Sequence, residues 1–481
     1  MPLKSNKWEG AAALALGCAL FGWFLVLMRR GLDSWFDADD LMNLHYYWSR
    51  PWSRLLKANL AFWSSYYRPA GGLFYRPIYA VWGFHPLPFR VVVLVLLSIN
   101  FVLLAIVVWQ LTGSRWSAIL ALVLIGINPS FASIYFEGGT IYDVLAFTFL
   151  WSAFGLYVRI RQRGHLPGWG SLALVFCLFA AALDAKEISV LLPVAVGLYE
   201  LVWHTPRSWR IRELWRWTLQ EGRFAVIGAL ADVVYVIGKR YGPESLWLVS
   251  AYQPHYSAAA YFQSLSNNLA QLIYKPVGLT PVRTAVLLVA MLAFAAVTRR
   301  RCLWWAVGFI AAGVLPLAFI PGRAGFAYLV PAVGWAVYAG GLWDWLIAFV
   351  TRKHVWLRIA VQVVLLVAIF MGVKHWQRVW LGMHAHAAQD GQARYRNYIE
   401  QIRALIPAPR KGARILLLSD AEGRDDYDVL FVMRLYYGDP KLVVDRMTVW
   451  RANHVQVDPN GYDYVLDWAG KRFVLVSHSS K

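Results

Sequence analysis

The chain has 481 residues, of which 59% are hydrophobic and only 15% are charged, and its mean hydropathy is +0.45. A soluble globular domain carries nearer 25% charged residues, so this composition excludes a soluble protein and indicates an integral membrane protein. The net charge of +20 does not indicate nucleic-acid binding, because the basic residues cluster in short loops between apolar runs. That arrangement is typical of membrane proteins that follow the positive-inside rule.

A helix needs about 20 apolar residues to cross the hydrocarbon core, and the chain holds about eleven runs near that length. We expect membrane spans over residues 10–28, 91–109, 116–135, 141–158, 169–185, 188–203, 224–238, 282–298, 303–320, 327–349 and 355–373. No small-residue cleavage site follows the first run, so we expect it to remain as a membrane anchor. The expected fold class is an all-α polytopic membrane domain over residues 1–373, followed by a small C-terminal α/β domain.

The positions of the arginines predict the orientation. Alternating from a cytoplasmic N-terminus, the basic loops at 159–163, 207–216 and 299–301 all fall on the cytoplasmic side, as the positive-inside rule requires. The outer side then receives the long first loop, about 30–90, and the tail from 374 to 481. Because the three cysteines lie inside apolar runs and no eukaryotic retention signal is present, we expect a bacterial inner membrane.

Three carboxylates gather in the first outer loop, within the segment 34–47: Asp37, Asp39 and Asp40. Charged groups beside the hydrocarbon are costly and mark candidates for function. A structural explanation is open as well, because Asp37 can cap a helix that begins at Ala38, with Asp40 completing a capping box. That explanation leaves Asp39 unassigned.

Other charged residues stand at the outer ends of later spans. Asp143 opens the fourth span, Lys186 and Glu187 follow the fifth, and Arg323 precedes the tenth. Each has a structural alternative: Asp143 can cap a helix, Lys186 and Glu187 can form a surface ion pair, and Arg323 can extend to the interface. Together they predict a site with carboxylates that accept a proton and cations that hold an anion.

The first outer loop also contains two Tyr-Arg-Pro triplets, centred on Arg68 and Arg76. Because proline disfavours helical conformation in the residue before it, we expect neither arginine to lie within a regular helix. Either guanidinium can bind a phosphate through two hydrogen bonds. Stacking on tyrosine is the alternative, and we favour it more for Arg68 than for Arg76.

The tail changes character. Residues 389–406 form an amphipathic helical pattern that ends at Pro407. Strands are expected over 414–418, 441–445, 462–467 and 472–476, with a helix over 427–437. These elements predict a soluble α/β domain over 374–481, which we expect to cover the outer face or to contact the acceptor.

The segments that suggest a family are Asp39-Asp40 in the first outer loop, Tyr75-Arg76-Pro77-Ile78, Asp143, Ala185-Lys186-Glu187 with Pro193, and the stretch from Arg323 to Pro331. Their order resembles the GT-C superfamily of polyprenyl-phosphate-sugar-dependent glycosyltransferases, closest to its protein O-mannosyltransferase, aminoarabinose transferase and TMTC-type branch. The resemblance covers about residues 1–370. The chain departs from the family pattern in having Asp-Asp instead of Asp-Glu, and in the four residues between Arg323 and Tyr328.

The resemblance implies that one sugar moves from a polyprenyl-phosphate-linked donor to a hydroxyl group on a glycan, lipid or protein acceptor, with inversion. Inversion needs a base for the acceptor proton. The resemblance implies Asp39 as this base, with Asp37 as second choice and Asp40 assisting.

The same resemblance assigns the remaining roles. Lys186, Arg323 and Arg76 are expected to bind the donor phosphate, while Asp143 and Glu187 are expected to assist the acceptor or a metal. The outer carboxylates offer the oxygen ligands that Mg²⁺ or Mn²⁺ prefers. The branch resembles a metal-free design, so we expect no metal and no cofactor.

A transporter or a lipid-linked glycan flippase is the main alternative, and a lipid-glycan polymerase is a second. Transporters place charges near the middle of the membrane, on broken helices. Asp232, inside the expected seventh span, is the feature that favours this alternative. A non-catalytic scaffold would leave the outer carboxylates unexplained.

Overall fold

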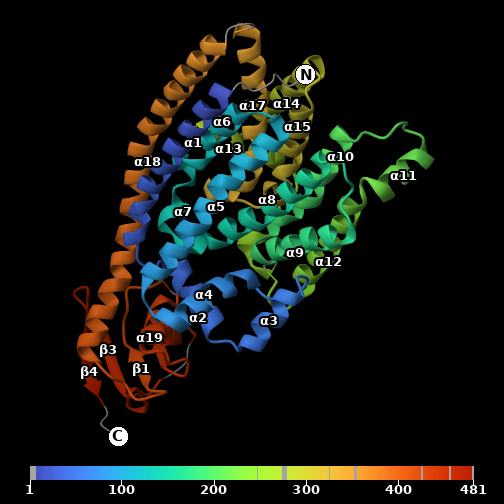
Figure 1. Cartoon of the computed structure of the whole chain (residues 1–481). Coiled ribbons are helices and arrows are strands. Elements are labelled where there is room, and N and C mark those ends of the chain that lie inside the picture. Colours follow the sequence, from blue (N-terminus) through green and yellow to red (C-terminus); the bar gives the residue numbers. More distant parts are fainter. Residues whose placement is uncertain are drawn as a thin grey trace.

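The computed structural model describes residues 7–245, 248–273, 279–323, 325–351, 355–423, 426–453 and 457–478. Most of these residues are helical, and a small four-stranded sheet lies in the C-terminal region (Figure 1). Ala324, within the stretch from Arg323 to Pro331, falls outside the described residues.

Seven helical segments in the described ranges are long and apolar enough to cross a membrane. They are Lys7–Asp33 (α1 and the turn after it), Pro86–Thr112 (α5), Gly138–Gln162 (α8 and the turn before it), Pro281–Thr298 (α14), Arg301–Ala318 (α15 and α16), Gly325–Thr351 (α17 and the turn before it) and Val355–Met383 (the first part of α18). They support a polytopic helical membrane protein, but the expected count of about eleven spans is not confirmed.

The other four expected spans correspond to shorter or more polar helices: α6 (Arg115–Ala121), α9 (Trp169–Ala185), α10 (Leu191–Trp203) and α12 (Arg223–Tyr241). The run at 116–135 is broken, because α6 widens into one π-helical turn at Leu122–Gly126 and then ends. Pro129 cannot donate a backbone hydrogen bond, and the Asn128 side chain accepts one from Ser130 N at 2.8 Å. A short helix, α7 (Ser133–Phe136), follows.

The segment expected to form the first outer loop, about 30–90, keeps that name below and folds into three helices, α2 (Ala38–Trp48), α3 (Trp52–Leu60) and α4 (Pro69–Trp82). Arg76 lies inside α4, so the expectation that it lies outside a regular helix was wrong. A proline inside a helix removes one backbone hydrogen bond at a cost of about 3 kcal/mol. Packing of the buried Tyr75 and Ile78 in the core offsets this cost at Pro77. Arg68, by contrast, stands before the helix with a left-handed φ of 37°.

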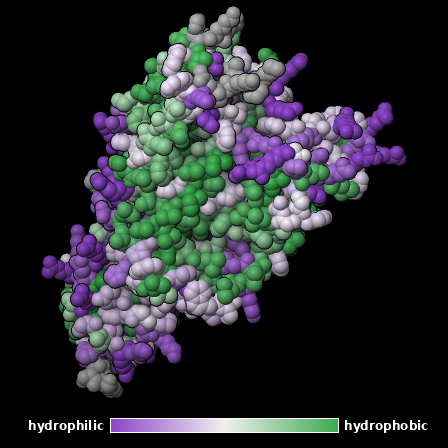
Figure 2. All heavy atoms as spheres, viewed as in Figure 1, coloured by the Kyte–Doolittle hydropathy of each residue, from purple (hydrophilic) through white to green (hydrophobic). Residues whose placement is uncertain are grey.

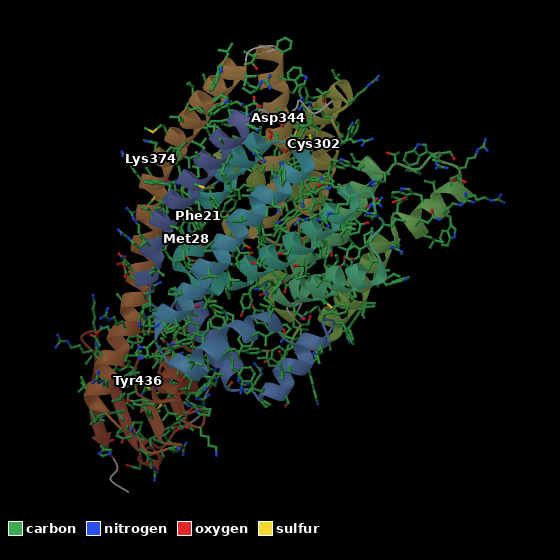
Figure 3. The ribbon with its side chains drawn as sticks, in the orientation of Figure 1. Phe21, Met28, Cys302, Asp344, Lys374 and Tyr436 are labelled. Carbon is green, nitrogen blue, oxygen red and sulfur yellow. The ribbon has the colours of Figure 1, made fainter. Side chains whose placement is uncertain are left out.

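Helix α18 (Val355–Leu405) is a single helix of 51 residues that runs along the molecule into the C-terminal region (Figure 1). The expected domain boundary at 373/374 therefore falls inside a helix. Buried glutamines tie α18 to the bundle: Gln377 accepts from Trp23 Nε1 at 3.1 Å and donates to Ile127 O at 2.6 Å. Near Gln377, Lys374 lies with its ammonium 5.2 Å from the centroid of the Trp23 ring (Figure 3).

The C-terminal sheet has the strand order β2-β1-β3-β4. Its strands are β1 (Arg414–Leu417), β2 (Val443–Arg446), β3 (Tyr464–Ala469) and β4 (Arg472–His478). Strand β1 is parallel to β2 and β3, and β4 is antiparallel to β3. The four strands and α19 (Asp428–Tyr437) agree with the sequence prediction, and α20 (Met447–Ala452) is additional.

Helix α19 packs on α2 of the first outer loop, so the C-terminal domain covers this loop. The Phe431 ring lies 4.8 Å from the His45 ring, and Tyr79 OH donates to Leu435 O at 2.6 Å. Burial, with the Arg434 charge, lowers the pKa of His45 to about 4. His45 is therefore neutral near pH 7, and it contacts Arg434 without charge repulsion.

Hydrophobic side chains gather over the middle of the molecule, and hydrophilic ones gather over the C-terminal domain and near α11 (Ile211–Gln220) (Figure 2).

Asp344 and Cys302 lie at the end of the bundle that is remote from Tyr436 of the C-terminal domain (Figure 3). At that remote end, Asp344 accepts hydrogen bonds from Ser114 and Ser117, both at 2.8 Å. The remaining long helix, α13 (Ala258–Ile273), packs on α14, α16 and α17.

Candidate active site

The cap of α2 accounts for two of the three clustered carboxylates. Asp40 N donates to the Asp37 side chain at 2.8 Å, and Asp37 N donates to Asp40 Oδ2 at 3.5 Å, which forms the predicted capping box. Burial and the Asp40 charge raise the pKa of Asp37. Asp37 does not line the cavity described below.

Asp40 is held by a buried network and does not line the cavity described below. Its carboxylate is 3% exposed, pairs with Arg90 Nη2 at 3.0 Å and accepts a hydrogen bond from Tyr75 OH at 2.9 Å. Arg90 also donates to the backbone oxygens of Ser34 and Trp35. Asp40 and Arg90 therefore fix the start of α2 against α5. Arg90 did not stand out in the sequence, although an arginine within an apolar run is a functional signal.

Two adjacent glycines of the second outer loop let the carboxylates approach its backbone. A Cβ atom on Gly138 would lie 1.9 Å from Asp40 Oδ1, and one on Gly139 would lie 2.5 Å from the Asp39 Cβ. Both distances are far below van der Waals contact. The turn at 138–140 and the start of α2 are therefore in direct contact because both positions lack a side chain.

Replacing Gly138 by alanine is expected to displace Asp40 from Arg90 and to destabilise the outer loops by several kcal/mol, because overpacking costs about 1–3 kcal/mol and a buried charge would lose its partner. Gly170→Ala is the matched control, since a Cβ there meets nothing within 4 Å. Thermal unfolding of the two purified variants measures the difference. Equal melting temperatures would contradict the close contact.

One cavity of about 690 Å³ opens beside Asp39. Its walls come from the first outer loop, the start of α8, the turn after α9, the end of α12, the loop after α12, and the chain from α16 to the start of α17. The candidate residues on its lining are Asp39, Asp143, Lys186, Glu187 and Arg323. Side chains from widely separated parts of the chain thus share one space. Part of the wall is apolar, including Val236, Leu317 and Ile320.

Two ion pairs organise the floor of this cavity. Lys186 Nζ lies 2.6 Å from both carboxylate oxygens of Asp143, and both residues are less than 10% exposed. Arg68 binds Glu187 side-on, with Nε to Oε1 at 3.2 Å and Nη2 to Oε2 at 3.0 Å. Removal of solvent acts to raise the pKa of Glu187, but the Arg68 charge outweighs it and lowers the pKa to about 2. Glu187 is therefore ionised and neutralises Arg68.

Arg68 stacks on tyrosine, as the sequence favoured, but it also lines the cavity, and Arg76 does not. Arg68 lines the cavity and lies against the rings of Tyr67 and Tyr142, with its guanidinium carbon 4.9 and 5.0 Å from their centroids. Arg76 does not line the cavity: it donates to Arg50 O and lies 4.4 Å from the Trp52 ring centroid. We therefore no longer assign phosphate binding to Arg76.

Asp39 and Arg323 are the charged candidates on the lining that lack a counterion. No described residue donates a hydrogen bond to the Asp39 carboxylate, which is exposed to the cavity. No carboxylate of a described residue pairs with Arg323, whose guanidinium carbon lies 4.4 Å from the Tyr252 ring centroid. Partial burial and the Asp40 charge raise the pKa of Asp39, against the opposing effect of Arg68. The cavity thus presents a carboxylate with raised proton affinity and an uncompensated cation.

Lys239 and Glu244 also line the cavity but were not singled out from the sequence. Lys239 donates to Tyr66 O at 2.7 Å, and Glu244 pairs with Arg54 at 2.8 Å. Both side chains therefore stabilise the first outer loop through these contacts. Lys239 lies in the last turn of α12, and Glu244 lies in the loop after it. Neither position gave a local signal in the sequence, because the partners of both residues lie far away in the chain.

The carboxylates that offer oxygen ligands for a metal ion do not converge on one point. Asp143 pairs with Lys186, Asp37 caps α2, and the described residues contain no group of three or more His, Cys, Asp or Glu side chains placed to hold a metal ion.

No protein-family model matches the chain, and no curated protein shows significant similarity to it.

Proposed function

We propose that the protein is a GT-C-like membrane glycosyltransferase, and that it transfers a sugar from a polyprenyl-phosphate donor to a hydroxyl acceptor, with inversion, on the outer face of a bacterial inner membrane. One observation carries the proposal: Asp39 and Arg323 line the same partly apolar cavity, and neither has a counterion among the residues that the structure describes. A general base and a phosphate-binding cation are the two groups that this reaction requires.

In the proposed reaction, the acceptor oxygen attacks the anomeric carbon while Asp39 takes the acceptor proton. The bond between the anomeric carbon and the phosphate oxygen breaks, and the phosphate leaves with the electron pair. Arg323 stabilises the negative charge on the phosphate through charge-assisted hydrogen bonds. The apolar wall with Leu317 and Ile320 suits the first isoprene units of the donor.

The ion pairs on the cavity floor have a second role in this proposal. Lys186 and Arg68 add positive charge near the phosphate, but Asp143 and Glu187 neutralise each of them. They therefore hold the floor rigid and leave Arg323 as the main phosphate ligand. Preorganised charges of this kind stabilise a transition state without reorganisation.

The start of α19 in the C-terminal domain lies near Asp39. Asp428, at the start of α19, lies near enough to Asp39 to raise its pKa, and Tyr395 OH of α18 holds Asp428 at 2.5 Å. We propose that an acceptor approaches Asp39 along this domain.

The transporter alternative rests on Asp232 of α12. Asp232 does not line the cavity, and one of its carboxylate oxygens is buried without a hydrogen-bond partner. A transport pathway that uses Asp232 would have to run outside the cavity, so we favour the enzyme.

Binding of a polyprenyl monophosphate to the purified protein in nanodiscs tests the donor class. Arg323→Gln is expected to weaken this binding about tenfold or more, because a hydrogen bond to a charged group contributes about 1.5–3 kcal/mol. Arg76→Gln, outside the cavity, is the matched control and is expected to bind like the wild type. Uncharged polyprenol is expected to bind both variants equally. Equal affinity of wild type and Arg323→Gln for the phosphate lipid would refute the assignment.

A further inference from the structure

Helix α11 stands apart from the cavity and from the rest of the bundle. It joins the ends of α10 and α12 and projects away from the bundle (Figure 1). None of its ten residues is buried. A helix without tertiary burial is marginal in water at this length, so another environment must stabilise it.

Its side chains separate into two faces. Ile211, Leu214, Trp215 and Leu219 follow the i, i+3, i+4, i+8 spacing of one helical face. The side chains of Ile211, Trp215 and Leu219 are 87, 66 and 54% exposed. The opposite face carries the polar residues Arg212, Glu213, Arg216 and Gln220.

Positive charge accumulates on this segment without compensation. Arg207, Arg210 and Arg212 have no carboxylate partner among the described residues, and Arg216 pairs only with the neighbouring Glu213 at 3.2 Å. Four arginines therefore accompany a single acid between residues 207 and 216. Trp209, 67% exposed, adds an aromatic side chain of the kind that anchors at membrane interfaces.

Polar contacts hold the C-terminal part of α11 at the level where α10 ends and α12 begins. Trp217 Nε1 donates to His204 O at 2.6 Å, at the end of α10. Glu221, just after α11, binds Arg161 of α8, which also binds Glu200 at 2.8 Å. These contacts keep α11 close to α8 and α10, so its apolar face remains near the boundary of the membrane spans.

We propose that α11 lies flat in the lipid–water interface at the cytoplasmic surface and that Arg207, Arg210 and Arg212 bind the headgroups of anionic phospholipids. The apolar face enters the lipid, while the arginines reach the phosphates. Its exposed apolar residues and its excess positive charge are both accounted for by this one environment. The inference does not depend on the proposed transferase activity.

The test uses single-cysteine variants in a background with Cys18, Cys177 and Cys302 replaced by alanine. An environment-sensitive NBD fluorophore is placed at Leu219→Cys, on the apolar face, or at Gln220→Cys, on the polar face. The full-length protein is reconstituted in vesicles of phosphatidylcholine mixed with phosphatidylglycerol. We expect the label at 219 to emit at shorter wavelength and to be quenched by lipid-borne spin labels more strongly than the label at 220.

Lipid selectivity is measured by comparing spin-labelled phosphatidylglycerol with spin-labelled phosphatidylcholine as quenchers of the label at 219. We expect phosphatidylglycerol to quench the label several-fold more strongly than phosphatidylcholine. This preference should disappear in the triple variant Arg207→Gln/Arg210→Gln/Arg212→Gln and at high salt. Thermal unfolding of the triple variant, compared with that of the wild type, serves as the folding control. Equal water exposure of both labels, which a free helix would give, overturns the proposal. A shorter emission wavelength at 219 without quenching by the lipid-borne spin labels, which a protein partner would give, overturns it as well. Equal quenching by the two lipids overturns the assignment of anionic headgroups.

Discussion

Asp39→Asn is expected to reduce sugar transfer by a factor of about 10²–10⁴, because this is the usual contribution of a positioned general base. The loss should appear in kcat, with little change in donor affinity, since Arg323 and the floor of the cavity remain. The asparagine can neither accept a proton nor restore the charge. Transfer assays on the purified variant, together with binding of a polyprenyl monophosphate, measure the two effects separately.

Asp33→Asn is the matched control for this experiment. Asp33 is an exposed carboxylate close to the first outer loop that lies outside the cavity, so its replacement should leave transfer unchanged. Because the environment raises the pKa of Asp39, wild-type activity should fall on the acid side at a pH above the ordinary aspartate value of about 3.9. Full activity of Asp39→Asn would rule out the base assignment.

Arg90→Met is expected to destabilise the protein by about 3–5 kcal/mol, because removing one partner of a buried ion pair leaves an uncompensated charge. Asp40 is 3% exposed, and Arg90 is 4% exposed. The start of α2 would also lose the hydrogen bonds from Arg90 to the backbone of Ser34 and Trp35. Thermal unfolding in detergent measures the loss, and transfer activity should fall with it, since Asp39 lies next to Asp40.

A double-mutant cycle separates charge from packing. Arg90→Met/Asp40→Asn removes the buried charge while an oxygen remains for Tyr75, so it should be more stable than Arg90→Met alone. Arg29→Met, which changes an exposed arginine near the same loop, should change stability little. If Arg90→Met and Arg29→Met cost the same, the buried pair does not hold α2.

Several features could be predicted because their signals are local. Apolar runs indicated a membrane protein, and the capping pattern at Asp37 and Asp40 predicted the start of α2, which the structure confirms. Short runs of strand-forming residues, separated by turn residues, predicted the four C-terminal strands. Lys186 and Arg323 were placed at outer span ends by counting spans, and both now line the cavity.

Other features could not be predicted because they depend on partners remote in sequence. Asp40 and Arg90 are 50 residues apart, and Arg68 and Glu187 are 119 apart. The same Tyr-Arg-Pro sequence occurs around Arg68 and Arg76, yet only Arg68 faces the cavity. Two identical triplets carry no local information about which of them meets a carboxylate from another helix.

The sequence by itself indicated a membrane protein and determined most local elements, because hydrophobic periodicity and capping act over a few residues. Only the tertiary structure decided which charges neutralise each other, and that Asp39 and Arg323 share one cavity without a counterion among the described residues. The physical reason is that pairing of buried charges depends on distance in space, which helix packing sets and sequence spacing does not.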